Sequence, residues 1–108
     1  MNTETLLEQT TSFRDDLLKD LTDTEFAMYY LEAALADYKK DGNTESLWMA
    51  LRDVVEAQGG IGKLAQRTKV NPQHLNDIFD AKQAPHLDNL QSILSGLGFQ
   101  IRLEFAKN

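Results

Sequence analysis

The twenty residues from 60 to 79, GIGKLAQRTKVNPQHLNDIF, constrain the fold more than any other stretch of this chain. Apolar residues recur at helical spacing on both sides of a break at Lys69-Val70-Asn71-Pro72. Asparagine is a favoured helix N-cap and proline is favoured at the first helical position, so a new helix is expected to begin at this break. The pattern predicts one helix over residues 61–68 and another from residue 71, which is the arrangement of a helix-turn-helix.

The second of these helices has an apolar face and a polar face. Leu75, Ile78 and Phe79 are predicted to pack inward, which turns Gln73 and Asn76 outward. In a helix-turn-helix the N-terminal part of the second helix enters the major groove, where amide side chains pair with adenine. The predicted base-reading residues are Gln73, His74, Asn76 and Asp77, and the predicted phosphate contacts are Gly62, Lys63, Arg67, Lys69, Asn71 and Lys82.

Two carboxylates on the same face, Asp77 and Asp80, weaken the DNA-binding interpretation. A carboxylate near base edges is tolerated mainly opposite the N4 donor of cytosine. The local positive excess is small, so we expect one copy to bind weakly and a dimer to read two half-sites about 34 Å apart. A protein-interaction module that keeps the helical corner without binding DNA is the alternative.

Helical spacing also predicts a short helix from Ser12, a longer helix opened by a capping box at Thr22–Glu25, and a third helix capped by Asn43 or Thr44. The longer helix is expected to end at Gly42, because glycine readily adopts the left-handed conformation that closes helices. A leucine-rich helix is expected over residues 86–97. The predicted fold is therefore all-α, a bundle of five to six helices with a helix-turn-helix. Its inward-facing residues are expected to include Phe13, Phe26 and Leu87.

The C-terminal segment has a different period. From Phe99 to Phe105, FQIRLEF, apolar and polar residues alternate, which predicts one half-buried β-strand. A lone strand needs a partner for its backbone groups, so we expect it to pair with a second copy or with another protein. The predicted dimer-interface residues are Leu94, Phe99, Ile101, Leu103 and Phe105.

Charge divides the chain into two halves. The formal net charge is −6, which argues against a general polyanion binder. Residues 1–58 contain five Lys/Arg and thirteen Asp/Glu, whereas residues 59–108 contain six Lys/Arg and four Asp/Glu. Halves of opposite sign suggest two different partners, although an acidic surface that only confers solubility is the simpler explanation.

Several classes of function find no support in the sequence. The chain has no cysteine, and its two histidines, twelve residues apart, have no third ligand at a useful spacing, so no metal site is expected. No catalytic triad, phosphate-binding glycine loop or metal-carboxylate motif is present, so neither an enzyme nor a cofactor is expected. The polar N-terminus is unlike a secretory signal and no apolar run could span a bilayer, so a cytoplasmic protein is expected.

Beyond these patterns, the sequence resembles a known family. The segments DLTDTEFAMYYLEAAL, ALRDVVEAQGGIGKLA and LGFQIRLEF occur in an order similar to that of the addiction-module antidote proteins, and the resemblance covers about residues 12–105. These are HigA-like antitoxins of type II toxin–antitoxin systems with a Cro/CI-type, lambda-repressor-like helix-turn-helix. One departure is Lys69, which stands where the turn commonly has glycine.

The resemblance implies a homodimeric repressor that neutralises a small, basic ribonuclease toxin of the RelE/HigB type and represses its own operon on double-stranded operator DNA. Residues 1–42 would then form an acidic toxin-binding segment, and residues 43–108 the DNA-binding domain with the C-terminal strand. The acidic half would complement a basic toxin. The candidate toxin contacts are Asp15, Asp16, Asp20, Asp23, Glu25, Tyr29 and Glu32. A helix-turn-helix regulator without a toxin remains an alternative.

Overall fold

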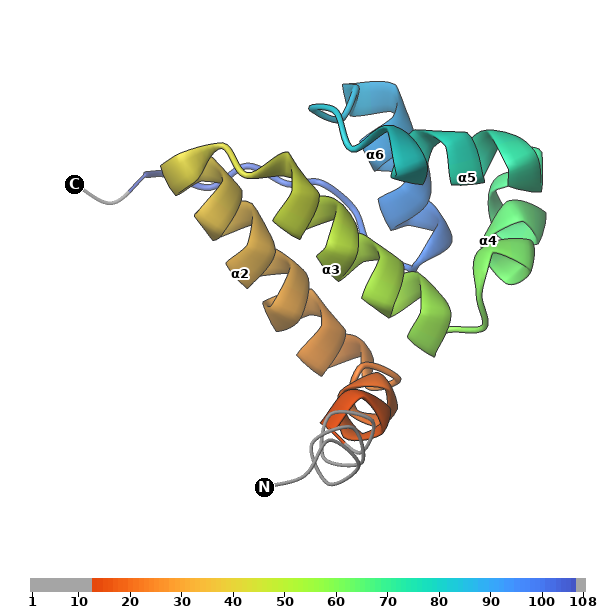
Figure 1. The fold of residues 1–108 in the computed structure, drawn as a ribbon. Helices are drawn as coiled ribbons and strands as arrows, with labels where there is room; N and C mark the ends of the chain where they lie inside the picture. Colours follow the sequence, from red (N-terminus) through yellow and green to blue (C-terminus); the bar gives the residue numbers. More distant parts are fainter. Residues whose placement is uncertain (1–12, 107–108) are drawn as a thin grey trace, which may run out of the picture.

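A computed structural model describes residues 13–106, and over this range the protein is all-α (Figure 1). A helical segment of residues 13–20 leads into α2 (Thr24–Asp41), which packs antiparallel against α3 (Thr44–Ala57). Three shorter helices follow: α4 (Ile61–Thr68), α5 (Pro72–Ala81) and α6 (Leu87–Gly96). Both α5 and α6 pack against α4, and the apolar core joins all three to α3. None of these helices is long and apolar enough to cross a membrane.

Both ends of α2 are closed by residues that suit those positions. The Asp23 carboxylate accepts hydrogen bonds from the backbone amides of Glu25 (2.9 Å) and Phe26 (3.3 Å), so Asp23 is the N-cap. The capping box predicted at Thr22 is therefore wrong by one residue, and the Thr22 hydroxyl instead donates to the carbonyl of Lys19. Gly42 ends α2 at φ 71, as predicted, since this left-handed conformation is accessible to glycine.

The predicted break between α4 and α5 is confirmed in position and in its cap. The Asn71 side chain accepts a hydrogen bond from the Gln73 amide at 2.8 Å, and Pro72 occupies the first turn of α5. Lys69 ends α4 in the left-handed region, at φ 60 and ψ 27. Lys69 therefore adopts the left-handed conformation itself, although this conformation favours glycine.

Helix α6 crosses α4 closely at Gly96. A Cβ atom at this position would lie 2.5 Å from Cδ1 of Leu64 and 2.7 Å from Cγ2 of Thr68. A hydrogen bond from the Arg67 guanidinium to the Gly96 carbonyl, at 3.3 Å, joins the same two helices. The absence of a side chain at Gly96 therefore sets how near α6 lies to α4.

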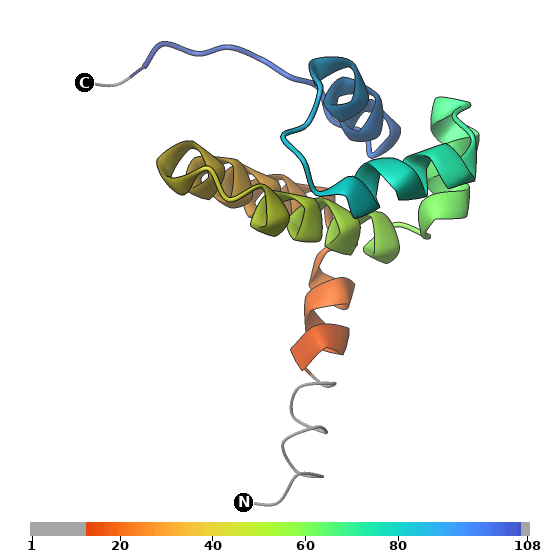
Figure 2. The ribbon, with the colours of Figure 1, turned by 45° about the horizontal axis from the view of Figure 1, so that its top comes forward.

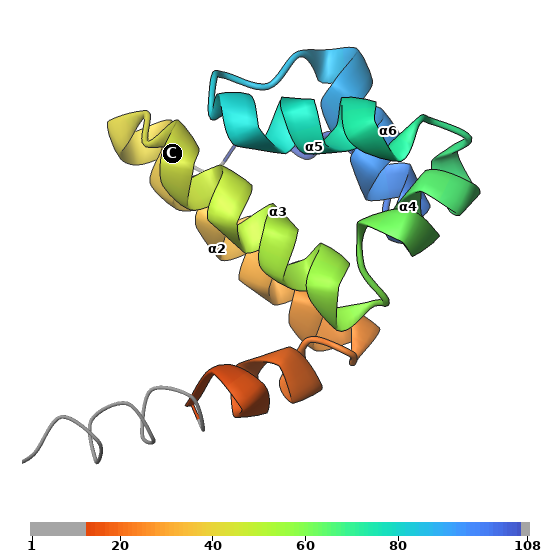
Figure 3. The ribbon, with the colours of Figure 1, turned by 45° about the vertical axis from the view of Figure 1, so that its right-hand side comes forward.

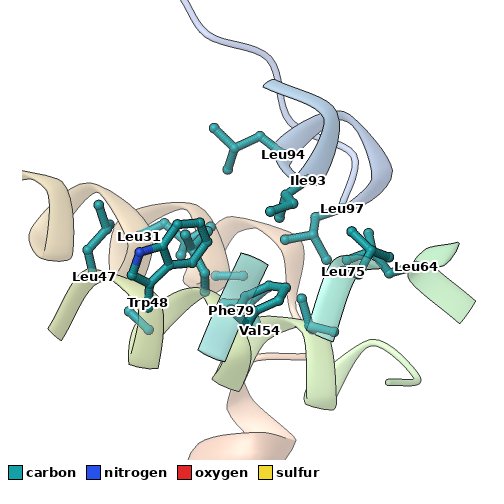
Figure 4. Close-up of a cluster of buried hydrophobic side chains, with 14 of the residues drawn as sticks. Leu31, Leu47, Trp48, Val54, Leu64, Leu75, Phe79, Ile93, Leu94 and Leu97 are labelled. Atoms are coloured by element: carbon teal, nitrogen blue, oxygen red, sulfur yellow. The ribbon is translucent and has the colours of Figure 1, made fainter. Parts of the chain in front are cut away.

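One apolar cluster joins all of these elements (Figure 4). Trp48 of α3 and Phe79 of α5 meet edge-to-face with ring centroids 5.3 Å apart, beneath Ile93 of α6. Leu31 of α2 belongs to the same cluster. The core includes residues on both sides of residue 42. The predicted division into segments 1–42 and 43–108 is a division by function, and it stays a prediction. Residues 1–12 of the first segment lie outside the described range.

The predicted C-terminal strand is wrong: residues 97–106 contain no strand, and neither does any other part of the described chain. Figure 2 shows this segment running outward from the end of α6, away from α4 and α5. Residues 13–106 contain no second strand with which the alternating segment could pair, so its backbone groups form no ladder there.

Three predicted core residues are also exposed. Phe13 is 73% accessible and Leu87, the first residue of α6, is 66% accessible, so no described helix covers either side chain. Phe26 is 42% exposed because the packed face of α2 is centred on Ala27 and Leu31. The helical period predicted which residues form the apolar face of a helix, but not where the burial of that face ends.

Candidate nucleic-acid interface

Helix α5 is anchored by its apolar face and presents its polar face outward. Leu75 and Phe79 are each 1% exposed, whereas Gln73 and Asp77 are exposed. The Gln73 side-chain amide donates a hydrogen bond to the Asp77 carboxylate at 3.0 Å, one helical turn along. His74 is exposed and Asn76 is half-buried. The predicted base-reading residues therefore all lie at or near the surface of one short helix.

Contacts from α3 hold the C-terminal half of α5. The Arg52 guanidinium lies 5.2 Å from the Phe79 ring centroid and forms an ion pair with Asp80 at 2.9 Å. Asp80 was a reason to doubt DNA binding, but here its carboxylate is engaged by Arg52. Asp77, by contrast, lies on the outer face, where its carboxylate accepts a hydrogen bond from the Gln73 amide.

The connection from α5 to α6 is tied to the start of α3. The Thr44 hydroxyl donates to the Lys82 carbonyl at 2.8 Å, and the Trp48 indole N–H donates to the Gln83 carbonyl at 2.7 Å. Lys82 has φ 54, and its ammonium lies 3.5 Å from the Glu45 carboxylate in an exposed pair. Because Thr44 and Trp48 fix the backbone here, Lys82 projects from a supported loop rather than from a free one.

Five of the predicted phosphate contacts lie along α4 and the turn after it, whereas Lys82 lies at the opposite end of α5, beside the start of α3. Gly60 opens α4 without a side-chain cap, so the first-turn amides of the helix are available to an acceptor. Gly62 has no atom within 4 Å of the position of a Cβ, so a phosphate can approach this backbone closely. All of the residues predicted to contact phosphate are exposed: Gly62, Lys63, Arg67, Lys69, Asn71 and Lys82. Three of them have additional contacts, since Arg67 binds the Gly96 carbonyl, Asn71 caps α5 and Lys82 pairs with Glu45.

The candidate toxin contacts, here called the acidic face, come from the helical segment 13–20, from α2 and from the N-cap between them. Figure 3 shows how the helical segment and α2 are arranged. The candidate contacts are all exposed, and Tyr29 is 58% accessible. The carboxylate of Asp23 already serves as the α2 cap. The residues of this face are Asp15, Asp16, Asp20, Asp23, Glu25, Tyr29 and Glu32.

The helical segment 13–20 is attached to α3 by a polar network. The Arg14 guanidinium binds Asp53 at 3.2 Å and Glu56 at 2.7 Å. The Tyr30 hydroxyl donates to the other oxygen of Asp53 at 2.9 Å. Burial, and then this hydrogen bond, raise the pKa of the Tyr30 hydroxyl to about 12. The acidic face is thereby oriented by residues that do not themselves belong to it.

The predicted dimer-interface residues divide into two groups. Leu94 is buried in the core of its own chain, and Phe99 is partly buried against the same core. Ile101, Leu103 and Phe105 are exposed. Only this last group is accessible to a second molecule without rearrangement.

Two surface depressions were not predicted from the sequence. One, of about 210 Å³, is lined by Trp48, Ile78 and the loop from Gln83 to His86, and another, of about 450 Å³, lies between α4 and α6. The second is largely polar, with Asp88 and Arg67 among its lining residues. In the part of the chain that is described, no group of three metal-ligating side chains comes together.

Sequence reasoning missed Arg52 and Trp48 as supports of the predicted reading helix. Their partners are 28 and 35 residues away in the chain, and no periodic pattern identifies pairs at such separations. Comparisons with protein-family models, with curated proteins and with solved structures give no match to this chain.

Proposed function

We propose that this protein is a DNA-binding antitoxin that represses its own operon, with α4 and α5 as its helix-turn-helix. The observation that carries the proposal is the polarity of α5: Leu75 and Phe79 are buried, while Gln73 lies exposed in the first turn. A helix anchored on one side and amide-bearing on the other has the form required to read base edges in a major groove.

The surroundings of α5 support the same function. Lys63 and Lys69 are exposed near the turn, and the open N-terminus of α4 supplies further amide donors for a phosphate.

The hydrogen bond between Gln73 and Asp77 has a consequence for base recognition. Bidentate pairing with adenine uses both atoms of the amide, so the Gln73 N–H must leave Asp77 when it contacts a base.

The acidic face supports the second part of the proposal, which is neutralisation of a small, basic ribonuclease. Its carboxylates are exposed beside Tyr29, and an amphipathic aromatic residue within a charged rim is typical of interface anchors. Electrostatic complementarity would accelerate association with a basic partner and exclude acidic ones.

A gel-shift assay with the DNA upstream of the gene, at two salt concentrations, tests the DNA-binding part. Gln73→Ala should remove sequence discrimination, at about 1–3 kcal/mol per lost base contact. Gln91→Ala is the matched control, because Gln91 is an exposed glutamine on α6. If operator preference survives Gln73→Ala unchanged, α5 is not the reading helix.

Lysine variants separate positioning from reading. Lys63→Ala should weaken binding to every sequence and lower the dependence of affinity on salt concentration, because a phosphate contact releases counterions. Lys39→Ala, an exposed lysine on α2, should leave both quantities unchanged. Equal losses in the two variants would indicate a long-range charge effect instead of a contact.

A specific observation favours a second candidate, a protein-interaction module without DNA binding: the exposed Asp77 carboxylate lies on the outer face of α5. Asp77→Asn removes the charge and keeps an acceptor for the Gln73 amide, so it should strengthen DNA binding if the proposal holds. No shift at low salt by either protein would favour the interaction module.

Co-purification with the product of the adjacent gene tests the antitoxin role. Binding to DNA without any such partner would indicate a stand-alone regulator.

A further inference from the structure

The C-terminal tail, residues 100–106, exposes large apolar side chains that no part of the described chain covers. Leu103 is 95% accessible, Phe105 is 99% accessible and Ile101 is about half exposed. The base of the tail is fixed, since the Phe99 amide donates to the Leu94 carbonyl at 2.8 Å. The tail therefore leaves the body at a defined place (Figure 2) and presents an apolar edge to solvent.

The tail is complementary to itself when it is read in the opposite direction. Its apolar residues occupy positions 101, 103 and 105, and its charged residues Arg102 and Glu104 flank Leu103 with opposite sign. We propose that two copies of the chain pair their tails as antiparallel strands around a two-fold axis at Leu103.

This register gives each of residues 101–105 a favourable partner. Leu103 faces its own copy, Ile101 faces Phe105 of the other copy, and Arg102 faces Glu104 of the other copy. Opposite charges and an aromatic residue beside a β-branched one are favourable cross-strand neighbours. The symmetric contact is isologous, so each favourable pair occurs twice.

Other registers lose these pairs. A parallel, in-register pairing places Arg102 against Arg102 and Glu104 against Glu104, which is repulsive. An antiparallel pairing centred on Ile101 places Arg102 opposite Gln100 and leaves Glu104 without a partner of opposite charge. A shift by a single residue moves the apolar side chains to the other face. Charge therefore selects one register among those that the backbone permits.

The paired tails would have one apolar face and one charged face, because side chains alternate across a strand. Ile101, Leu103 and Phe105 of both copies lie on the apolar face. A two-stranded ribbon is marginal in water by itself, so this face is expected to turn toward the bodies of the two copies. A second copy would thus supply the partner strand that residues 13–106 of one chain do not contain.

Sedimentation equilibrium of the full chain tests the register through charge exchange. Arg102→Glu places two pairs of carboxylates opposite each other, and Glu104→Arg places two pairs of guanidinium groups opposite each other. We expect each variant alone to dimerise at least about tenfold more weakly than the unchanged chain, which corresponds to about 1.4 kcal/mol. An equimolar mixture of the two should form a heterodimer, because all its cross-strand charge pairs are again opposite.

The double variant R102E/E104R is the matched control, since its composition and net charge equal those of the unchanged chain. It should dimerise as the unchanged chain does, and all variants should keep the same helix content by circular dichroism because the tail lies outside the helices. A monomeric unchanged chain throughout the measured concentrations, or a mixture no more associated than its components, would overturn the proposal. The test contains neither DNA nor another protein, so its outcome is independent of the proposed function.

Discussion

Gly96→Ala should destabilise the protein although alanine is the better helix former. The new methyl group would lie 2.5 Å from Leu64 Cδ1 and 2.7 Å from Thr68 Cγ2. Carbon atoms in contact ordinarily lie about 3.5–4 Å apart, so the two helices must separate by about 1 Å or the side chains must move. Leu64 is 2% exposed, so its side chain is enclosed by the core.

The expected size of this effect follows from two opposing contributions. Overpacking a filled core costs about 1–3 kcal/mol. Exchanging glycine for alanine gains up to about 1 kcal/mol in a helix interior, and less at Gly96, which is the last residue of α6. The free energy of unfolding should therefore fall by about 1–2 kcal/mol, which lowers the melting temperature by several degrees in a chain of this size.

Gly62→Ala is the matched control, because it makes the same chemical change in α4. No atom lies within 4 Å of a Cβ at Gly62, and its φ is not positive. This variant should be as stable as the unchanged protein or more stable by up to about 1 kcal/mol. Urea unfolding followed by the fluorescence of Trp48, the single tryptophan of the chain, measures both variants. If Gly96→Ala equals Gly62→Ala in stability, α6 does not cross α4 as closely as described here.

Two further predictions concern local conformation and pH. Lys69→Gly should raise the free energy of unfolding by about 0.5–1 kcal/mol in urea titrations, because Lys69 has φ 60 and a left-handed conformation is unfavourable for a side chain with a Cβ; the same variant should weaken DNA binding, and a loss of stability would refute the explanation. The pKa of Tyr30, raised to about 12 by burial and the bond to Asp53, means that the folded state favours the neutral phenol. Its contribution is fully present below about pH 10 and is lost as the pH rises toward 12, so stability should fall more steeply over this range in the unchanged protein than in Tyr30→Phe. Equal slopes in the two proteins would show that Tyr30 does not contribute.

Local chemistry made the helix boundaries predictable. Asn71 before Pro72 determined the start of α5, and Gly42 determined the end of α2, because both residues act through the backbone of their own turn. The same local reasoning misplaced one cap, at Thr22, since two neighbouring side chains could each have capped α2. The Asp23 carboxylate captured the amides of Glu25 and Phe26 instead.

Non-local geometry limited the rest. Helical spacing marked Phe26 and Leu87 as inward-facing, but a helix buries only the part of its stripe that a neighbour covers, and no period specifies where that neighbour ends. The strand prediction was wrong for a related reason: alternation indicates a side-chain pattern, while strand formation requires a second backbone. The exposure of the candidate DNA-reading residues, by contrast, followed from the burial of Leu75 and Phe79, which the spacing did predict.

Helix α3 supports both candidate surfaces through adjacent residues. Arg52 binds Asp80 and covers Phe79, so it fixes the end of α5, while Asp53 binds Arg14 and Tyr30, so it fixes the acidic face. Neighbouring residues on a helix point about 100° apart, so one short stretch of α3 can support two separate faces without either one covering the other. The opposite charges of the two halves are thus carried on one core, and under the proposed function the two partners would bind to separate faces of it.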